Sequence, residues 1–230
     1  MSLKVILTGA TGFVGGEVLA QCRRNPDISS IVVLTRRPLP GAVSDDPKVK
    51  QIVMKDFKVY SDDAKRDLEG ADACVWALGA RMAVPEVEID YPLALARTIV
   101  AIRPSASTKP FRYIYCSGVA AERDQTKPLW FSQTVRRTKG RAESSMLDFA
   151  AAQGEGVWET YIVKPGMITR PGGDGLKRLV SDALVGSVRV DELAAMMVEV
   201  VSGGAPKGQE TFLNAESVDM GREVLDKREW

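Results

Sequence analysis

The sequence predicts an α/β protein with a doubly wound parallel sheet. Three observations lead to this expectation. Short apolar runs alternate with amphipathic helical patterns along the chain, many of the runs are rich in branched residues typical of strands buried on both faces, and the first run passes through a glycine-rich turn into a helical pattern. Alternation of this kind places successive strands side by side in parallel, joined by right-handed crossovers.

The first strand ends in a glycine turn that is typical of dinucleotide sites. Glycines stand at positions 9, 12 and 15, and a helix is predicted over 14–24. At this spacing glycine permits a sharp turn, close approach of backbone N–H groups to a pyrophosphate, and close packing of helix on strand. The helix N-terminus then faces an anion. The expected cofactor contacts here are Gly9, Thr11, Gly12, Phe13 and Val14.

The second strand, predicted at 31–35, ends in Arg36 and Arg37. In sites that prefer NAD, an acidic residue about 20 positions beyond the glycines holds the ribose 2′-hydroxyl. Arginine instead offers a planar, permanently charged fork that suits a phosphate. Two solvated surface arginines would give the same pattern, but their position favours NADP(H) as the cofactor.

Two further strands, predicted at 49–54 and 73–78, also end in candidate nucleotide contacts. After the first, an aspartate carboxylate and the next backbone N–H can reach an adenine edge, although an aspartate there is also a common helix cap. After the second, a turn of small residues lets the backbone lie against the nucleotide, and packing alone would also explain it. The residues in question are Asp56, Phe57, Ala77, Leu78 and Gly79.

The remaining elements complete the alternation. Strands are predicted at 111–116, 158–163 and 209–213, and helices at 61–69, 90–103, 134–153, 191–202 and 215–228, with a Gly/Pro-rich stretch at 165–175 and a short amphipathic segment at 176–185. We expect one nucleotide-binding domain over 1–230. Its core would extend to about residue 165, and a smaller substrate-side part would cover about 166–230.

Composition narrows the function classes. The 230 residues are 45% hydrophobic and 27% charged with a formal net charge of +1, so electrostatics gives no reason to expect nucleic acid or an anionic membrane as partner. No apolar run is long enough to span a membrane and the chain enters a strand at once, which predicts a cytoplasmic protein. The three cysteines are far apart and predict reduced, buried thiols. Histidine is absent, which excludes imidazole bases, and no metal site is expected.

Eight motifs occur in the order seen in atypical short-chain dehydrogenases, which the chain resembles. They are TGATGFVG at 8–15, Arg36-Arg37, Lys55-Asp56-Phe57, ALGAR at 77–81, VEIDY at 87–91, YIYCSG at 113–118, TKGRAE at 138–143 and IVKPGMI at 162–168. The resemblance looks closest to the Tat-interacting-protein-like and NmrA-like NAD(P)-binding branch, and is strong to about residue 168. It implies a Rossmann fold, Ser117 and Lys139 as catalytic residues, and Lys139 and Gly166 as cofactor contacts.

One residue departs from that superfamily. There, a tyrosine four positions before the lysine exchanges a proton with the substrate oxygen, but Val135 stands at this position. None of the tyrosines, at 60, 91, 113, 115 and 161, is followed by a lysine at the fourth position. Either another group supplies the proton, or the protein binds cofactor without ordinary carbonyl reduction.

Other groups near the predicted sheet edge are candidates for the proton transfer. They are Ser117, Tyr115, Tyr91, Asp90 and Arg81. Ser117 is the strongest of these candidates for lining the site. For three of the others a structural role is the alternative: Tyr115 as strand core, Asp90 as the N-cap of the next helix, and Arg81 as a solvated loop charge.

The substrate should meet segments beyond the carboxyl ends of the strands. These are Met82–Pro85, Leu129–Phe131 and Met167–Gly175. Trp130 and Phe131 stand in an otherwise polar loop and predict either a pocket wall for an apolar or aromatic substrate or a staple of the loop to the core. The stretch RPGGDG in the last segment has the composition of a lid.

Two function classes follow from these features. In the first, the protein is an NADP(H)-dependent oxidoreductase, or a non-redox isomerase or cyclase in the same pocket, acting on a small organic molecule. In the second, it is an NADP(H)-sensing regulator that binds a protein partner. The Ser117–Lys139 pair favours the first and Val135 favours the second or a non-redox enzyme. A homodimer remains open.

Overall fold

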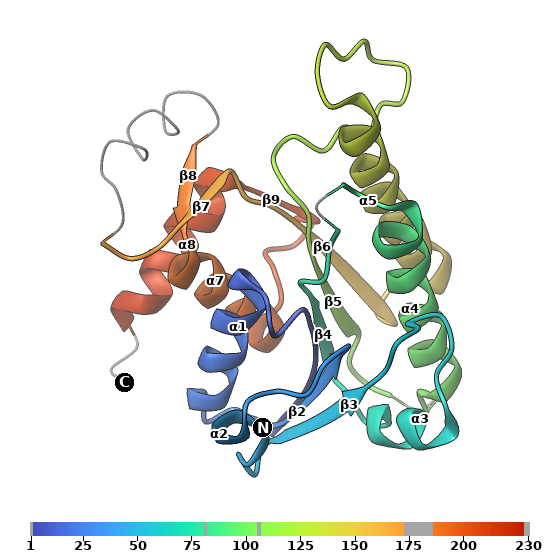
Figure 1. Cartoon of the computed structure of the whole chain (residues 1–230), viewed down its shortest axis with the longest axis vertical. Coiled ribbons are helices and arrows are strands. Elements are labelled where there is room, and N and C mark those ends of the chain that lie inside the picture. Colours follow the sequence, from blue (N-terminus) through green and yellow to red (C-terminus); the bar gives the residue numbers. More distant parts are fainter. Residues whose placement is uncertain (1, 81, 105–106, 173–185, 228–230) are drawn as a thin grey trace.

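A computed structural model describes residues 2–80, 82–104, 107–172 and 186–227. Its centre is a seven-stranded parallel sheet with the strand order β3-β2-β1-β4-β5-β6-β9. Helices cover both faces, with α1 and α7 on one and α3, α4 and α5 on the other (Figure 1). This is the doubly wound Rossmann arrangement that the sequence predicts.

The elements agree with the predicted alternation to within a few residues in most places. The strands are β1 (Leu3–Thr8), β2 (Ile28–Thr35), β3 (Val49–Val53), β4 (Ala73–Trp76), β5 (Phe111–Cys116), β6 (Trp158–Lys164), β7 (Met167–Thr169), β8 (Ser187–Arg189) and β9 (Thr211–Leu213). The helices are α1 (Phe13–Arg24), α2 (Gly41–Ser44), α3 (Asp62–Leu68), the π-helix η1 (Glu86–Asp90), α4 (Tyr91–Ile102), α5 (Gln133–Gln153), α7 (Val190–Gly203) and α8 (Asn214–Lys227).

The central strands are buried on both faces, as their apolar runs predict. In β1, Val5 and Leu7 pack toward α1 and α7, whereas Ile6 between them packs toward α4 and α5, and all three side chains are fully buried. Successive side chains of a strand point to opposite faces, so an unbroken apolar run supplies both cores at once.

Four short elements lie outside the predicted pattern: α2, η1 and the two-stranded parallel sheet β7-β8. Each has three to five residues, too few for a periodicity to be read from the sequence. The expected segment at 176–185 lies outside the described residues. Asp90 stands at the N-cap position of α4, as predicted, but it has helical φ and ψ angles as the last residue of η1, and its side chain caps no described backbone group.

All pairings in the large sheet are parallel, so the strands end at one edge. Thr8 pairs with both Leu34 and Trp76, Trp76 pairs with Tyr115, and Cys116 pairs with Val163. The strand order reverses between β1 and β4, which is where open parallel sheets bind ligands. Residues that directly follow these strands therefore form the candidate site.

Candidate cofactor and active site

The glycine turn has the shape that a dinucleotide requires. Gly9 has φ +72°, and a Cβ there would clash with the Ala77 carbonyl, while a Cβ on Gly15 would clash with the Gly9 carbonyl. Gly12 is the N-cap of α1, and a Cβ there meets only the Gly9 oxygen, at 3.1 Å. In the described chain no side chain caps this helix end, so its first-turn N–H groups face outward for an anion.

The remaining predicted residues of this turn divide between core and surface. Thr11 and Phe13 are exposed beside the turn, whereas Val14 is half-buried and packs against the core. The guanidinium carbon of Arg170 lies 5.7 Å from the centroid of the Phe13 ring. Phe13 and Thr11 therefore border the place where a pyrophosphate would approach, and Val14 anchors the helix.

Arg36 and Arg37 directly follow β2, the neighbour of β1, and both are exposed. The Thr35 hydroxyl donates a hydrogen bond to the Arg37 carbonyl at 2.8 Å, which fixes the backbone of this turn and leaves both side chains outside it. Two permanent positive charges thus stand at the strand end next to the glycine turn, as a 2′-phosphate would require.

The candidate adenine contacts have different surroundings. The Asp56 carboxylate accepts the backbone N–H of Lys58 at 2.8 Å and is exposed. Phe57 is 1% exposed, and its ring stacks on Tyr91 with centroids 5.5 Å apart. The Phe57 side chain is therefore a core residue, and only its backbone is available for a nucleotide.

The turn 77–79 packs directly against the glycine turn. The Leu78 N–H donates to the Thr8 hydroxyl at 3.2 Å, and the close approach of Gly9 to the Ala77 carbonyl joins the two turns. A Cβ on Gly79 would lie 3.7 Å from the Lys139 amine. The turn thus links the predicted cofactor site to the predicted catalytic lysine.

A buried glutamate, which the sequence analysis missed, holds Lys139. The Glu88 side chain is 1% exposed, and its Oε2 lies 3.1 Å from the Lys139 amine. The other oxygen, Oε1, accepts the Ala80 N–H at 2.7 Å, and the Tyr115 hydroxyl donates to Oε2 at 3.2 Å. One carboxylate from η1 therefore connects the ends of β4 and β5 with α5.

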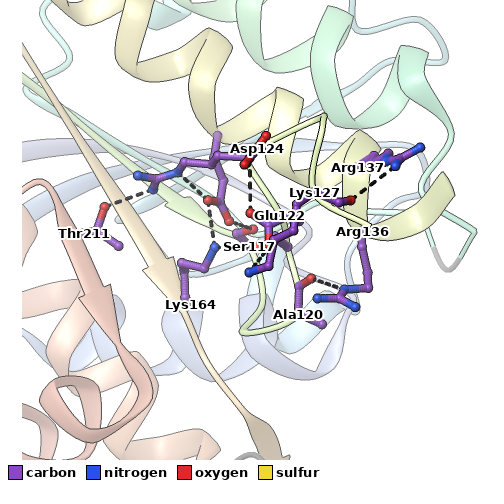
Figure 2. A network of polar contacts seen from close by, with 12 residues as sticks. Ser117, Ala120, Glu122, Asp124, Lys127, Arg136, Arg137, Lys164 and Thr211 are labelled. Atoms are coloured by element: carbon purple, nitrogen blue, oxygen red, sulfur yellow. Dashed lines mark hydrogen bonds and ion pairs between the residues drawn. The ribbon is translucent and has the colours of Figure 1, made fainter. Parts of the chain in front are cut away.

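A second buried glutamate, also missed, holds Ser117. The Ser117 hydroxyl donates to Oε1 of Glu143 at 2.5 Å, and Glu143 is fully buried. Its Oε2 lies 2.7 Å from Nε of Arg123 and 2.9 Å from Nζ of Lys164. Figure 2 shows Ser117, Lys164 and Thr211 in this polar network.

The tyrosine that the superfamily uses has no described substitute next to Lys139. Tyr115 is strand core, as expected, and burial together with the neighbouring Glu88 raises the pKa of its phenol well above the usual range. The Tyr91 ring is stacked on Phe57. Val135 lies on α5 one helical turn before Lys139 and is half-buried. Arg81, the other charged candidate, lies outside the described residues.

The substrate-side segments are more exposed than the sequence suggests. Trp130 is 94% exposed, which contradicts the role of a staple that ties the loop to the core, and Phe131 stacks under the Arg136 guanidinium at 4.8 Å. Met82 is also exposed, whereas Leu129 is buried. The Gly166 N–H is bound to the Asn214 side chain at 2.8 Å, so α8 holds the end of β6. The predicted lid lies partly outside the described residues.

Three further observations concern metal binding, membrane spans and the cysteines. In the described parts of the chain, no group of three or more His, Cys, Asp or Glu could hold a metal ion. No helix described here is long and apolar enough to cross a membrane. None of the three cysteines forms a disulfide; Cys22 and Cys74 are buried, and Cys116 is half-buried at the end of β5.

Comparison with known proteins gives the site its context. A family described as NAD(P)H-binding matches residues 9–203. The chain is 33% identical over 121 residues to leucinostatins biosynthesis cluster protein T from Purpureocillium lilacinum, and 30% identical over 137 residues to an isonitrile lipopeptide synthase from Streptomyces coeruleorubidus. These matches cover 50% and 59% of this chain, but only 42% and 9% of those relatives.

Solved structures share the fold. FolM alternative dihydrofolate reductase 1 from Brucella canis, complexed with NADP, matches with a TM-score of 0.69 at 14% identity over 99% of this chain and 98% of that one. The PhqB reductase domain from Penicillium fellutanum matches with a TM-score of 0.66 at 18% identity over 95% and 68%. Gre2 from Candida albicans, in complex with NADPH, matches with a TM-score of 0.65 at 15% identity over 92% and 78%.

Proposed function

The chain belongs to the NAD(P)H-binding family, and we propose that it is an NADP(H)-dependent oxidoreductase of the atypical short-chain dehydrogenase type that acts on a small organic molecule. One observation carries the proposal: Ser117 and Lys139 are each held by a buried carboxylate at the sheet edge where the glycine turn also lies. Such rigid placement suits groups that must meet a bound cofactor and substrate.

The residues fit the cofactor as follows. The outward-facing N–H groups at the start of α1 would bind the pyrophosphate, and Arg36 and Arg37 the 2′-phosphate. Asp56 and the Phe57 backbone would meet the adenine, and the turn 77–79 would lie along the nucleotide. Lys139 would hold the nicotinamide ribose. When bound, NADPH supplies the hydride.

The substrate side lacks the group that donates the proton to the substrate oxygen in the superfamily. Ser117 would orient the substrate oxygen, but its single hydroxyl proton is directed at Glu143. With valine at position 135 and Tyr115 buried, no described phenol faces this oxygen. The proton would therefore come from water or from the substrate, at the cost of a slower reaction than with a positioned acid.

The similarity to proteins of biosynthetic function supports a small-molecule substrate, since one relative is named for leucinostatins biosynthesis. The valine at position 135 and the burial of the Tyr115 phenol favour a second candidate, an NADP(H)-sensing regulator that binds a protein partner. The two differ in whether bound NADPH is consumed.

The test measures cofactor affinity and turnover together. We expect NADP(H) to bind at least about tenfold tighter than NAD(H), or about 1.4 kcal/mol, and Arg36→Ala to remove most of this preference. We also expect NADPH absorbance to fall with at least one member of a panel of ketones, aldehydes and enones. Equal affinity for the two cofactors would contradict the arginine assignment. Tight NADPH binding without turnover on any panel member would favour the regulator.

A further inference from the structure

The polar cluster around Ser117 carries an excess of positive charge. It consists of Arg123, Glu143, Lys164 and Thr211, which we call the Glu143 cluster. Two cations share one carboxylate oxygen, because Arg123 and Lys164 both contact Oε2 of Glu143. Neither cation has another ion pair within the described residues. The cluster therefore has a formal charge of +1.

Other carboxylates nearby are already engaged. Glu122 pairs with Lys127 at 2.9 Å, and the Asp124 carboxylate accepts the backbone N–H and the hydroxyl of Thr126 at 2.9 and 2.6 Å. Glu88 is paired with Lys139. Asp124 keeps its negative charge, but no ion pair joins it or Glu122 to Arg123 or Lys164 among the described residues, so neither acid of this loop (Figure 2) takes up the donors of the two cations.

Both cations have N–H groups to spare. Lys164 has three donors, of which two are directed at Glu143 and at the Ala121 carbonyl, each at 2.9 Å. Arg123 has five, of which Nε faces Glu143 and Nη2 donates to Thr211 at 3.0 Å. The Glu143 side chain is 0% exposed, Lys164 is 12% and Arg123 is 35% exposed. The carboxylate is therefore inside, and the two cations that hold it are partly exposed.

The cluster stands beside the predicted reaction centre. The Ser117 N–H donates to the Val163 carbonyl at 2.8 Å, and Lys164 is the next residue of β6. Ser117 and Lys164 are therefore neighbours at the carboxyl ends of adjacent strands. A substrate whose reacting carbon lies at Ser117 would bring its next substituent to these cations.

We propose that this cluster binds a carboxylate on the substrate, so that the substrate class is a small oxo acid. The inference rests on the proposed oxidoreductase function and specifies its substrate. Reduction would transfer a hydride from NADPH to the carbonyl carbon and a proton from water to the carbonyl oxygen, giving a hydroxy acid and NADP⁺. Spare N–H donors of Lys164 and Arg123 would hold the carboxylate by charge-assisted hydrogen bonds.

The experiment compares benzoylformate with its neutral methyl ester. The quantity measured is the kcat/KM for benzoylformate divided by the kcat/KM for the ester, both from NADPH oxidation. Comparing this ratio between variants cancels the intrinsic reactivity of the two carbonyls. Lys164→Met removes the excess charge and should lower the ratio at least about tenfold. Glu143→Gln keeps the side-chain shape and raises the cluster charge to +2, so it should raise the ratio. Lys164→Arg should retain most of it.

The opposite changes expected for Lys164→Met and Glu143→Gln distinguish an effect of charge from damage to the fold. Both variants break the same contact, so disruption alone would change the ratio in one direction, and that result would overturn the proposal. Lys127→Met is the matched control. Lys127 lies in the loop that carries Arg123 and pairs with Glu122, so its loss should leave the ratio unaltered. Thermal unfolding of each variant confirms that it is folded.

A binding measurement keeps the two proposals distinguishable. Calorimetric titration of the NADP⁺-loaded protein with benzoate should show binding that Lys164→Met weakens and Glu143→Gln strengthens. If benzoate follows this pattern but neither carbonyl is reduced, the anion site stands and the oxidoreductase proposal fails. If the ester is reduced, and Lys164→Met alters neither benzoate binding nor the ratio, the oxidoreductase stands and the anion site is refuted. No benzoate binding by the wild type also refutes it.

Discussion

Glu88 and Glu143 are both buried, and each holds one of the two predicted catalytic side chains, but their charge balance differs. Glu88 meets one cation, Lys139, together with a neutral phenol and a backbone N–H. Glu143 meets two cations, Arg123 and Lys164, together with the Ser117 hydroxyl. The lysine side is therefore neutral as a unit, and the serine side is positive.

This difference assigns the two carboxylates different tasks. Around Glu88, η1, the end of β4 and α5 are joined without net charge next to the predicted cofactor site, so Lys139 is positioned while its charge is compensated. Around Glu143, the ends of β5 and β6 are joined with a charge that an incoming anion can balance. Under the two proposals, Glu88 would position the lysine on the cofactor side, and the Glu143 cluster would recognise the substrate.

The largest expected effect comes from adding a proton donor beside the substrate oxygen, which neither glutamate provides. Positions 135, 139 and 143 follow at intervals of four on α5, so a phenol at 135 would share the face of Lys139. We expect Val135→Tyr to accelerate NADPH-dependent reduction of methyl benzoylformate by about 10²–10⁴-fold, since a positioned acid typically contributes this much. Stopped-flow hydride transfer measures it.

The reduction rate of the wild-type protein can contradict this prediction. The contradicting result is fast reduction by the wild-type protein that is unaltered in Val135→Tyr and abolished in Ser117→Ala. It would show that the Ser117–Glu143 pair already delivers the proton to the substrate oxygen and that the valine at position 135 does not limit the rate. Val135→Phe is the matched control, because it adds the ring without the hydroxyl.

The second prediction measures the two charge balances as stability. Removing one partner of a buried ion pair typically costs about 3–5 kcal/mol. We expect Glu143→Ala to fall in this range, since it leaves Arg123 and Lys164 adjacent without a counter-charge. Glu88→Ala should cost about 1–2 kcal/mol less, because only Lys139 is left and its side chain is 23% exposed. Urea unfolding of both proteins tests the order, and a larger loss for Glu88→Ala would contradict it.

The cofactor half of the fold follows from local rules, which explains why the sequence predicts it. The φ angle of +72° at Gly9 and the close approach at Gly15 admit only glycine, so the spacing alone indicates the turn. The placement of Arg36 and Arg37 follows from the end of an apolar run. Buried strands such as β5 and β6 are recognisable for the same reason, because their composition decides their position.

The substrate half depends on contacts between residues that are distant in the sequence. Helical spacing and hydrophobicity alone therefore do not reveal the partners of its side chains. Lys139 and Glu143 are four positions apart on α5, the spacing at which side chains of one helix can pair with each other. In the structure each instead pairs with a group from another element, Lys139 with Glu88 and Glu143 with Arg123 and Lys164. The apolar residues Ala142 and Met146 on α5 were the available signal that Glu143 faces inward. For Trp130, the exposed ring contradicts one of the two predicted roles, the staple to the core, and leaves the pocket wall as a prediction.

The smallest expected effect uses Cys116 as a reporter between the two glutamates. Burial raises the pKa of its thiol to about 11; the positive charge of Lys139 opposes this rise and the negative charge of Glu88 adds to it. At pH 8 only about one thiol in a thousand is then ionised, so alkylation by iodoacetamide should be slow. Glu88→Gln removes a negative charge and leaves Lys139 unpaired, and both changes lower the pKa, so alkylation should become severalfold faster.

Glu143→Gln is the matched comparison for this reporter. Glu143 is not among the groups that shift the pKa of Cys116, so the alkylation rate should stay near that of the wild type. Cys22 and Cys74 are fully buried, and mass spectrometry of the labelled peptide therefore reads one site. Equal acceleration in the two variants would mean that loss of either carboxylate simply loosens the sheet edge. Acceleration in Glu88→Gln alone would show that the two glutamates control separate electrostatic units, one beside the cofactor and one beside the substrate.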